Sequence, residues 1–124
     1  MKQERPVYLD PLGYKYPIAA FASLTHRITG VLLFPAIAYL LWLLGLALQS
    51  PEGFDRVKVI LDAPVPKLVL LLVLVSLAYH LFAGVKHLVM DLHYWDSLQA
   101  GRYSSIGVMV LTGVSAILII LWLW

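Results

Sequence analysis

The sequence predicts an all-α integral membrane protein with three transmembrane helices. Only 13% of its 124 residues are charged and 61% are hydrophobic, whereas a soluble domain of this size is about one-quarter charged. The apolar residues fall into three blocks of 18 or 19 residues that contain no Asp, Glu, Lys or Arg. Because about 20 helical residues cross the hydrocarbon layer of a bilayer, each block is expected to span it once.

The three blocks predict three helices within one domain that occupies residues 1–124. The first helix is expected over about 20–49, with Pro17 ahead of it and Pro35 inside it as the cause of a kink. The second is expected over about 66–92 and the third over about 104–124. Between the first two helices, Ser50-Pro51-Glu52 indicates a turn or the start of a short interfacial helix.

Basic residues predict the orientation, because cytoplasmic loops of membrane proteins carry an excess of Lys and Arg. With the N-terminus inside, six basic residues lie on the cytoplasmic side and three lie outside. The sequence therefore favours an N-in, C-out topology. The first 27 residues contain no early apolar run, and Glu4 and Asp10 are atypical of an organellar precursor. A bacterial inner (cytoplasmic) membrane is the expected location.

Two features of the composition narrow the range of functions. The chain contains no cysteine, which excludes disulfides and an ordinary Cys-ligated iron–sulfur cluster within it. The net charge of +2 comes from the basic flanks of the membrane segments, so it gives no support to nucleic-acid binding.

His80 lies about halfway along the second apolar block, where a polar group without a partner is costly. A neutral imidazole in hydrocarbon is also a common axial ligand of haem iron. Gly84 and His87 follow at i+4 and i+7 on the same helix face, and His87 lies about 10 Å further along the axis, about the reach from haem iron to the propionates. This strip predicts a haem site; the alternative is a buried histidine that a neighbouring helix hydrogen-bonds.

A second polar group lies at the start of the first helix. Ser23 and Arg27 are i,i+4 neighbours and share one face, while His26 is offset from Arg27 by one residue. With the N-terminus inside, this group and the Lys86-His87 end of the second helix reach a similar depth. Such donors could bind haem propionates or hydrogen-bond a quinone carbonyl. The alternative is that Arg27 only snorkels to the interface and sets the topology.

The chain reads as a subunit of a multi-subunit helical bundle. One mid-membrane histidine cannot fill both axial positions of a six-coordinate haem, and His26, His87 and His93 are expected near the inner surface. A second ligand must therefore come from another polypeptide or another copy. Small residues are frequent in the helices, which suits close packing against further helices.

Two longer motifs and two short matches carry a family resemblance. The motifs are Ser23-x-x-His26-Arg27-x-Thr29-Gly30 and His80-x-x-x-Gly84-Val85-Lys86-His87-Leu88-x-Met90-Asp91, and the short matches are Arg5-Pro6-Val7 and Ser50-Pro51-Glu52-Gly53-Phe54. Over essentially its whole length the chain resembles the cytochrome b-type membrane-anchor subunits of succinate dehydrogenase (succinate–quinone oxidoreductase, respiratory complex II). It departs from them at Lys86, where arginine is usual, and at His93, where a small residue is usual.

The resemblance implies a role for each matching residue. His80 would be an axial ligand of haem b, with the other ligand supplied by a second membrane-anchor subunit. His26, Arg27 and His87 would lie near the propionates, with Gly84 beside the macrocycle, and Ser23 and Arg27 would belong to the ubiquinone site. Succinate oxidation would occur at FAD in a flavoprotein subunit, and electrons would reach quinone through the clusters of an iron–sulfur subunit.

Other readings remain open at this point. A haem-free structural anchor would dock the soluble subunits but would not need His80. A fumarate reductase anchor shares the chemistry but often lacks this histidine arrangement. A small transporter is disfavoured, because the sequence shows neither a pair of broken helices nor an intramembrane carboxylate.

Overall fold

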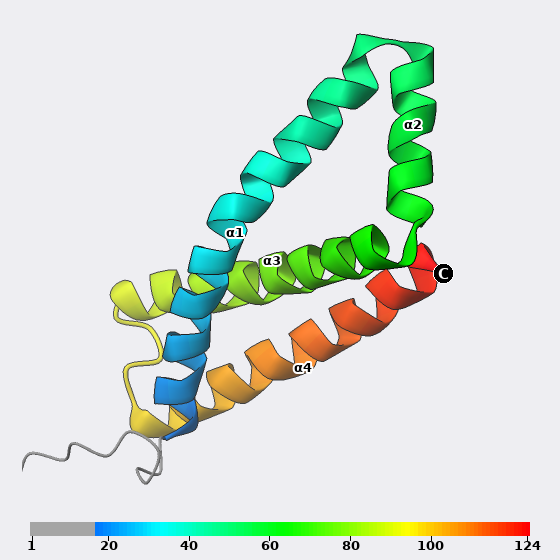
Figure 1. Ribbon diagram of the computed structural model, residues 1–124. Helices are drawn as coiled ribbons and strands as arrows, with labels where there is room; N and C mark the ends of the chain where they lie inside the picture. The colour runs from blue at the N-terminus through cyan, green and yellow to red at the C-terminus, as the bar shows by residue number, and fades with distance from the viewer. Residues whose placement is uncertain (1–16) are drawn as a thin grey trace, which may run out of the picture.

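The computed structural model describes residues 17–124, and the part of the chain that it describes contains helices and no strand. Four helices follow one another: α1 (Ile18–Gln49), α2 (Pro51–Asp62), α3 (Pro64–Asp91) and α4 (Leu98–Leu123) (Figure 1). The all-α prediction is confirmed. The Arg5-Pro6-Val7 match and the basic residues Lys2 and Lys15 lie outside the described residues.

Within residues 17–124, α1, α3 and α4 are long and apolar enough to cross a membrane, as predicted. Their bounds are close to the expected ones, except that α4 begins at Leu98 rather than near residue 104. The extra turn forms because Ser97 caps the helix, its Oγ accepting from the Ala100 backbone N–H at 3.1 Å. α1 continues through Pro35 as a single helix of 32 residues.

The segment between the first two spans forms the separate helix α2, so the helical alternative for Ser50-Pro51-Glu52 is the one observed. Ser50 is its N-cap and accepts from the Gly53 N–H at 3.0 Å, and Pro51 follows at the first helical position. The pKa of Glu52 is lowered by its own backbone N–H and by the Ser50 side chain, which hydrogen-bond its carboxylate. At the other end, Lys67 of α3 donates to Asp62 at 2.8 Å.

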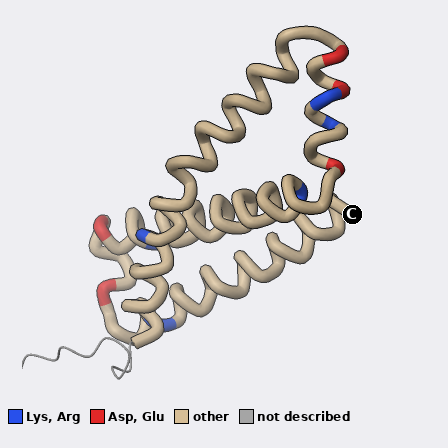
Figure 2. The backbone as a smooth tube through the Cα atoms, in the orientation of Figure 1, with Lys and Arg blue, Asp and Glu red and all other residues tan. Residues whose placement is uncertain are grey.

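The spans are not arranged as three parallel rods. α3 and α4 run side by side in opposite directions, whereas α1 crosses α3 with its N-terminal half and then diverges (Figure 1). α2 leads back from the far end of α1 to the start of α3. Figure 2 shows charged residues on α2 and at the opposite end of α3 and α4, with an uncharged stretch between them. This distribution is the one expected of segments whose middle lies in hydrocarbon.

The chain buries few of its large apolar side chains against itself. The buried cluster consists of Tyr79, Ala83 and Val108, with Phe82 packed against it. Many leucines, valines and aromatic residues of α1, α3 and α4 stay exposed within the described chain. So large an apolar surface requires lipid or further protein to cover it.

We expect Gly53→Ala to destabilise the junction of α1 and α2, because the added Cβ would overlap the Leu46 carbonyl oxygen. Backbone cannot rotate away as a flexible side chain can, so α2 must shift, at a typical cost of about 1–3 kcal/mol. The thermal unfolding midpoint of the protein, purified from its membrane in mild detergent, measures the effect. Gly45→Ala is the matched control, since nothing lies within 4 Å of its Cβ position. Equal midpoints for the two variants would contradict the prediction.

Candidate functional site

Several polar side chains of α1 and α3 meet where these two helices cross. At this crossing the Tyr79 hydroxyl of α3 donates to the Ala22 carbonyl oxygen of α1 at 2.9 Å, and both residues are buried. Ala22 and Ala83 are each 1% exposed. Two alanines with almost no exposed surface let the backbones approach, and the buried hydrogen bond fixes which turn of α1 meets which turn of α3.

His80 lies one residue further along α3, and its Nδ1 contacts α1. Nδ1 is 3.1 Å from the His26 carbonyl oxygen and 3.2 Å from the Thr29 Oγ1. A backbone carbonyl can only accept, so the proton of the neutral imidazole belongs on Nδ1. Nε2 then carries the free lone pair, which is the form of histidine that ligates a metal.

Two further histidines surround His80. The His26 ring stacks on the His80 ring, with centroids 4.1 Å apart and planes 16° from parallel. The His87 ring lies 5.2 Å from the His26 ring at an angle of 49°. The sequence grouped His26 with His87 near the inner surface, and that depth stays a prediction. The structure adds the contact with His80, which forms because α1 crosses α3 obliquely.

Two glycines face the histidine rings, and only at Gly30 is the space too small for a Cβ in ordinary contact. A Cβ on Gly30 would lie 3.1 Å from Cε1 of His80, and a Cβ on Gly84 would lie 3.5 Å from Nε2 of His26. The first of these distances is tighter than ordinary packing allows. The Nε2 of His26 is buried and has no hydrogen-bond partner among residues 17–124. A buried nitrogen of this kind is costly unless a further group supplies a partner.

The stacking of His26 on His80 limits the number of iron ligands that this chain can supply. The two stacked rings lie face to face, whereas two axial ligands direct nitrogens at iron from opposite sides of a macrocycle. His26 therefore cannot be the second axial ligand while it stacks on His80. Within residues 17–124 no group of three His, Cys, Asp or Glu side chains could hold a bare metal ion. The Nε2 of His80 would suit iron whose other ligands come from a porphyrin and a second polypeptide.

Ser23 and Arg27 occupy the flank of α1 rather than the histidine cluster of His26, His80 and His87. Ser23 is half-buried and Arg27 is exposed. Arg27 borders a shallow groove of about 260 Å³ together with Ile28, Val31 and Leu32. In the described part of the chain, no hydrogen bond joins Ser23 or Arg27 to the three histidines.

The sequence grouped Lys86 with His87 as neighbouring hydrogen-bond donors, and the structure separates the two side chains. The Lys86 side chain points to α4, where Nζ donates to the Ser105 Oγ at 2.9 Å. Ser105 in turn donates to the Gly101 carbonyl at 2.7 Å, and Lys86 is only 4% exposed. One residue along a helix turns a side chain by about 100°, which is why neighbours on α3 face different helices. His93 lies in the loop after α3 at φ 63°, with Nδ1 3.4 Å from Asp96.

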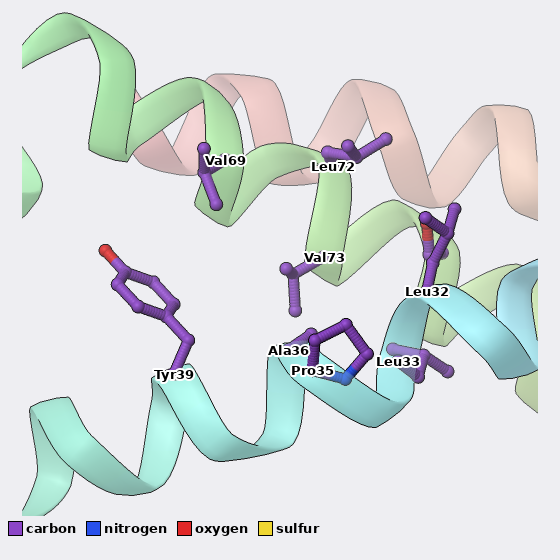
Figure 3. A pocket seen from close by; sticks show the side chains of 9 residues that line it. Leu32, Leu33, Pro35, Ala36, Tyr39, Val69, Leu72 and Val73 are labelled. Atoms are coloured by element: carbon purple, nitrogen blue, oxygen red, sulfur yellow. The ribbon is translucent and has the colours of Figure 1, made fainter.

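An apolar cavity of about 270 Å³ begins next to the histidine cluster, where α1 and α3 diverge. Figure 3 shows Pro35 and Ala36 of α1 opposite Val73 of α3, with Tyr39 further along α1. Ser76 and Leu33 also line it, one helical turn from His80 and from Thr29 respectively. An apolar space beside a polar cluster suits a ligand with a hydrophobic body and a polar edge.

The comparisons with known proteins agree on one family. Residues 1–121 match the family described as the succinate dehydrogenase/fumarate reductase transmembrane subunit. The chain is 36% identical to the succinate dehydrogenase cytochrome b556 subunit of Coxiella burnetii, over 100% of both chains. It is 31% identical to the protein of the same name from Paracoccus denitrificans, over 92% of this chain and 88% of the relative. The protein of that name from Rickettsia prowazekii is also 31% identical, over 100% and 97%.

We expect Ser105→Ala to lower stability by about 1–3 kcal/mol, because it leaves the buried Lys86 ammonium without its hydroxyl acceptor. In a Lys86→Met background the same change should cost less, since no buried charge remains to be satisfied. Chemical unfolding of all four forms in detergent provides the double-mutant cycle. A cycle with no interaction energy would show that the contact between α3 and α4 does not depend on this pair.

Proposed function

Because the chain belongs to the succinate dehydrogenase/fumarate reductase transmembrane subunit family, we propose that it is the cytochrome b-type membrane anchor of a succinate–quinone oxidoreductase. The family expected from the two motifs is thereby confirmed, and so is a multi-pass membrane protein. Relatives that cover the chain from end to end carry the name cytochrome b556. That name supports haem b as the cofactor.

The observation that carries the haem proposal is the state of His80. It sits on a membrane-length helix, its Nδ1 is occupied by α1, and no residue of the described range 17–124 hydrogen-bonds to its Nε2. We propose Nε2 as one axial ligand of haem b, with the other ligand from a second membrane-anchor subunit. The haem would supply one-electron transfer within the membrane.

The remaining cluster residues fit the polar edge of that cofactor. The buried Nε2 of His26 has no hydrogen-bond partner among residues 17–124 and can donate or accept, and Gly84 lies beside it. The His87 ring lies 5.2 Å from the His26 ring. We propose that His26, Arg27 and His87 neutralise and hydrogen-bond the propionates, as cationic and imidazole donors do for carboxylates.

Ser23 and Arg27 are the residues proposed for the ubiquinone site. A hydroxyl and a guanidinium on one flank of α1 can both donate hydrogen bonds to a quinone carbonyl oxygen. They can also donate to the negatively charged oxygen that this carbonyl becomes during reduction. Arg27 stabilises the negative charge that develops as electrons arrive, before protons neutralise it. The exposure of Arg27 and the groove beside it leave room for such a ligand.

The rest of the enzyme would lie in partner subunits. We propose that the iron–sulfur clusters lie in an iron–sulfur subunit, because this chain contains no cysteine to ligate them. We also propose that a flavoprotein subunit holds FAD and oxidises succinate. The exposed apolar surfaces of α1 and α4 support contact with a second membrane anchor. We propose a bacterial inner membrane and an N-in, C-out orientation, which puts Ser23 and Arg27 on the cytoplasmic side.

We expect His80→Leu to abolish or greatly weaken haem retention, because leucine offers iron no lone pair. The dithionite-reduced minus oxidised visible spectrum of the complex, purified with its natural partners, measures this through the b-type α-band. His93→Leu is the matched control, since His93 lies in an exposed loop. A normal α-band in His80→Leu would refute the ligand assignment, and a flat spectrum from the active unmodified complex would favour a haem-free structural anchor.

We expect Arg27→Leu to lower the rate of ubiquinone reduction by about 10-fold or more, because a hydrogen bond from a charged group is worth about 1.5–3 kcal/mol. Ser23→Ala should lower it by several-fold, because a neutral hydrogen bond is worth about 1 kcal/mol. Succinate oxidation with an artificial acceptor should be unchanged, because that reaction needs only the soluble subunits. Arg102→Leu and Ser104→Ala are the controls on α4. Parallel loss of both activities would mean failed assembly and would count against the quinone-site proposal.

A further inference from the structure

We infer that Thr29 is a positioning residue for His80: with the His26 carbonyl it holds the Nδ1 proton and so determines the tautomer, ring orientation and donor strength of this histidine. The inference rests on the proposed role of His80 as a haem ligand. Thr29 is 7% exposed and lies directly before Gly30, whose missing Cβ admits the His80 ring. Its hydroxyl is the one side-chain oxygen that contacts His80 among residues 17–124.

The hydrogen-bond geometry determines which group donates. The Thr29 hydroxyl hydrogen can go to the Thr25 carbonyl at 3.0 Å or to the His26 carbonyl at 2.9 Å. Either choice leaves lone pairs on Oγ1, and these face Nδ1 of His80 at 3.2 Å. Thr29 therefore accepts from the imidazole and donates to its own helix.

The His26 carbonyl alone is a poor acceptor for the same proton. Helix geometry already gives it the Gly30 backbone N–H, and the Thr29 hydroxyl is close enough to add a second donor. A carbonyl oxygen has two lone pairs. With Thr29 Oγ1 as a second acceptor, the Nδ1 proton is shared between two oxygens rather than competing for one.

Such a hydrogen bond changes the ligand as well as its position. Acceptors on Nδ1–H push electron density toward Nε2, and the histidine becomes a stronger donor to iron. A stronger donor favours the oxidised metal, so it lowers the midpoint potential of a haem. Removing the hydroxyl should therefore raise the potential and weaken haem retention.

The test compares three variants in the complete purified complex. Thr29→Val is nearly isosteric and removes the hydroxyl, Thr29→Ser retains it, and Thr112→Val removes a threonine hydroxyl that bonds only within α4. We expect Thr29→Val to shift the haem midpoint potential to more positive values. We also expect this variant to lose haem about 10-fold faster. This is the lower end of the effect seen when a metal-bound histidine loses its hydrogen-bond partner, because the His26 carbonyl remains as an acceptor. Thr29→Ser should restore both quantities, and Thr112→Val should change neither.

The outcomes separate this inference from the proposed function. An unchanged potential and unchanged haem loss in Thr29→Val, in a complex that loses its α-band in His80→Leu, would overturn the role of Thr29 and leave the ligand assignment intact. A His80→Leu complex with normal haem would overturn both. If Thr29→Ser fails to restore the potential, the effect of Thr29→Val comes from packing and the inference is wrong.

Discussion

The crossing of α1 and α3 is the contact on which the rest of the structure depends. Two buried alanines bring the backbones together, and the Tyr79 hydroxyl fixes the register by donating to the Ala22 carbonyl. The Tyr79 hydroxyl has no water to bond to in an apolar medium, so a slip of one turn would leave it buried without an acceptor. The same register places His80, the next residue along α3, against His26 and Thr29.

α3 makes side-chain hydrogen bonds with two neighbouring helices, α1 and α4, through different residues. One face carries His80 and faces the imidazoles and hydroxyl of α1, while another carries Lys86 and faces Ser105 of α4. The two faces have different partners: His80 hydrogen-bonds to α1, whereas Lys86 hydrogen-bonds to Ser105 and joins α3 to α4. Because most of the remaining surface is apolar and exposed, the chain is built to be completed by lipid and by other subunits.

Composition and pattern alone determined much of this protein. Three uncharged, continuously apolar blocks of about 20 residues favour helices, because a helix makes every backbone hydrogen bond within its own segment in hydrocarbon. The 3.6-residue period put His80, Gly84 and His87 on one face, and the motifs around them identified the family before any coordinates. Ser23 and Arg27 as quinone-site residues, and His80 as an iron ligand, remain predictions that the proposed variants test.

Only the tertiary structure decided how the helices meet. The periodicity of one helix says nothing about the angle at which another crosses it, so the stacking of His26 on His80 and the contact from Thr29 were out of reach of the sequence. For the same reason Lys86 was grouped with His87, although its partner is on α4. Local caps extended α4 back to Leu98 and made α2 a full helix, since a serine Oγ pairs an otherwise orphaned N–H at each start. The sequence determined which residues are polar in the membrane; the crossing angle decided which of them touch, because contact depends on the relative placement of two helices.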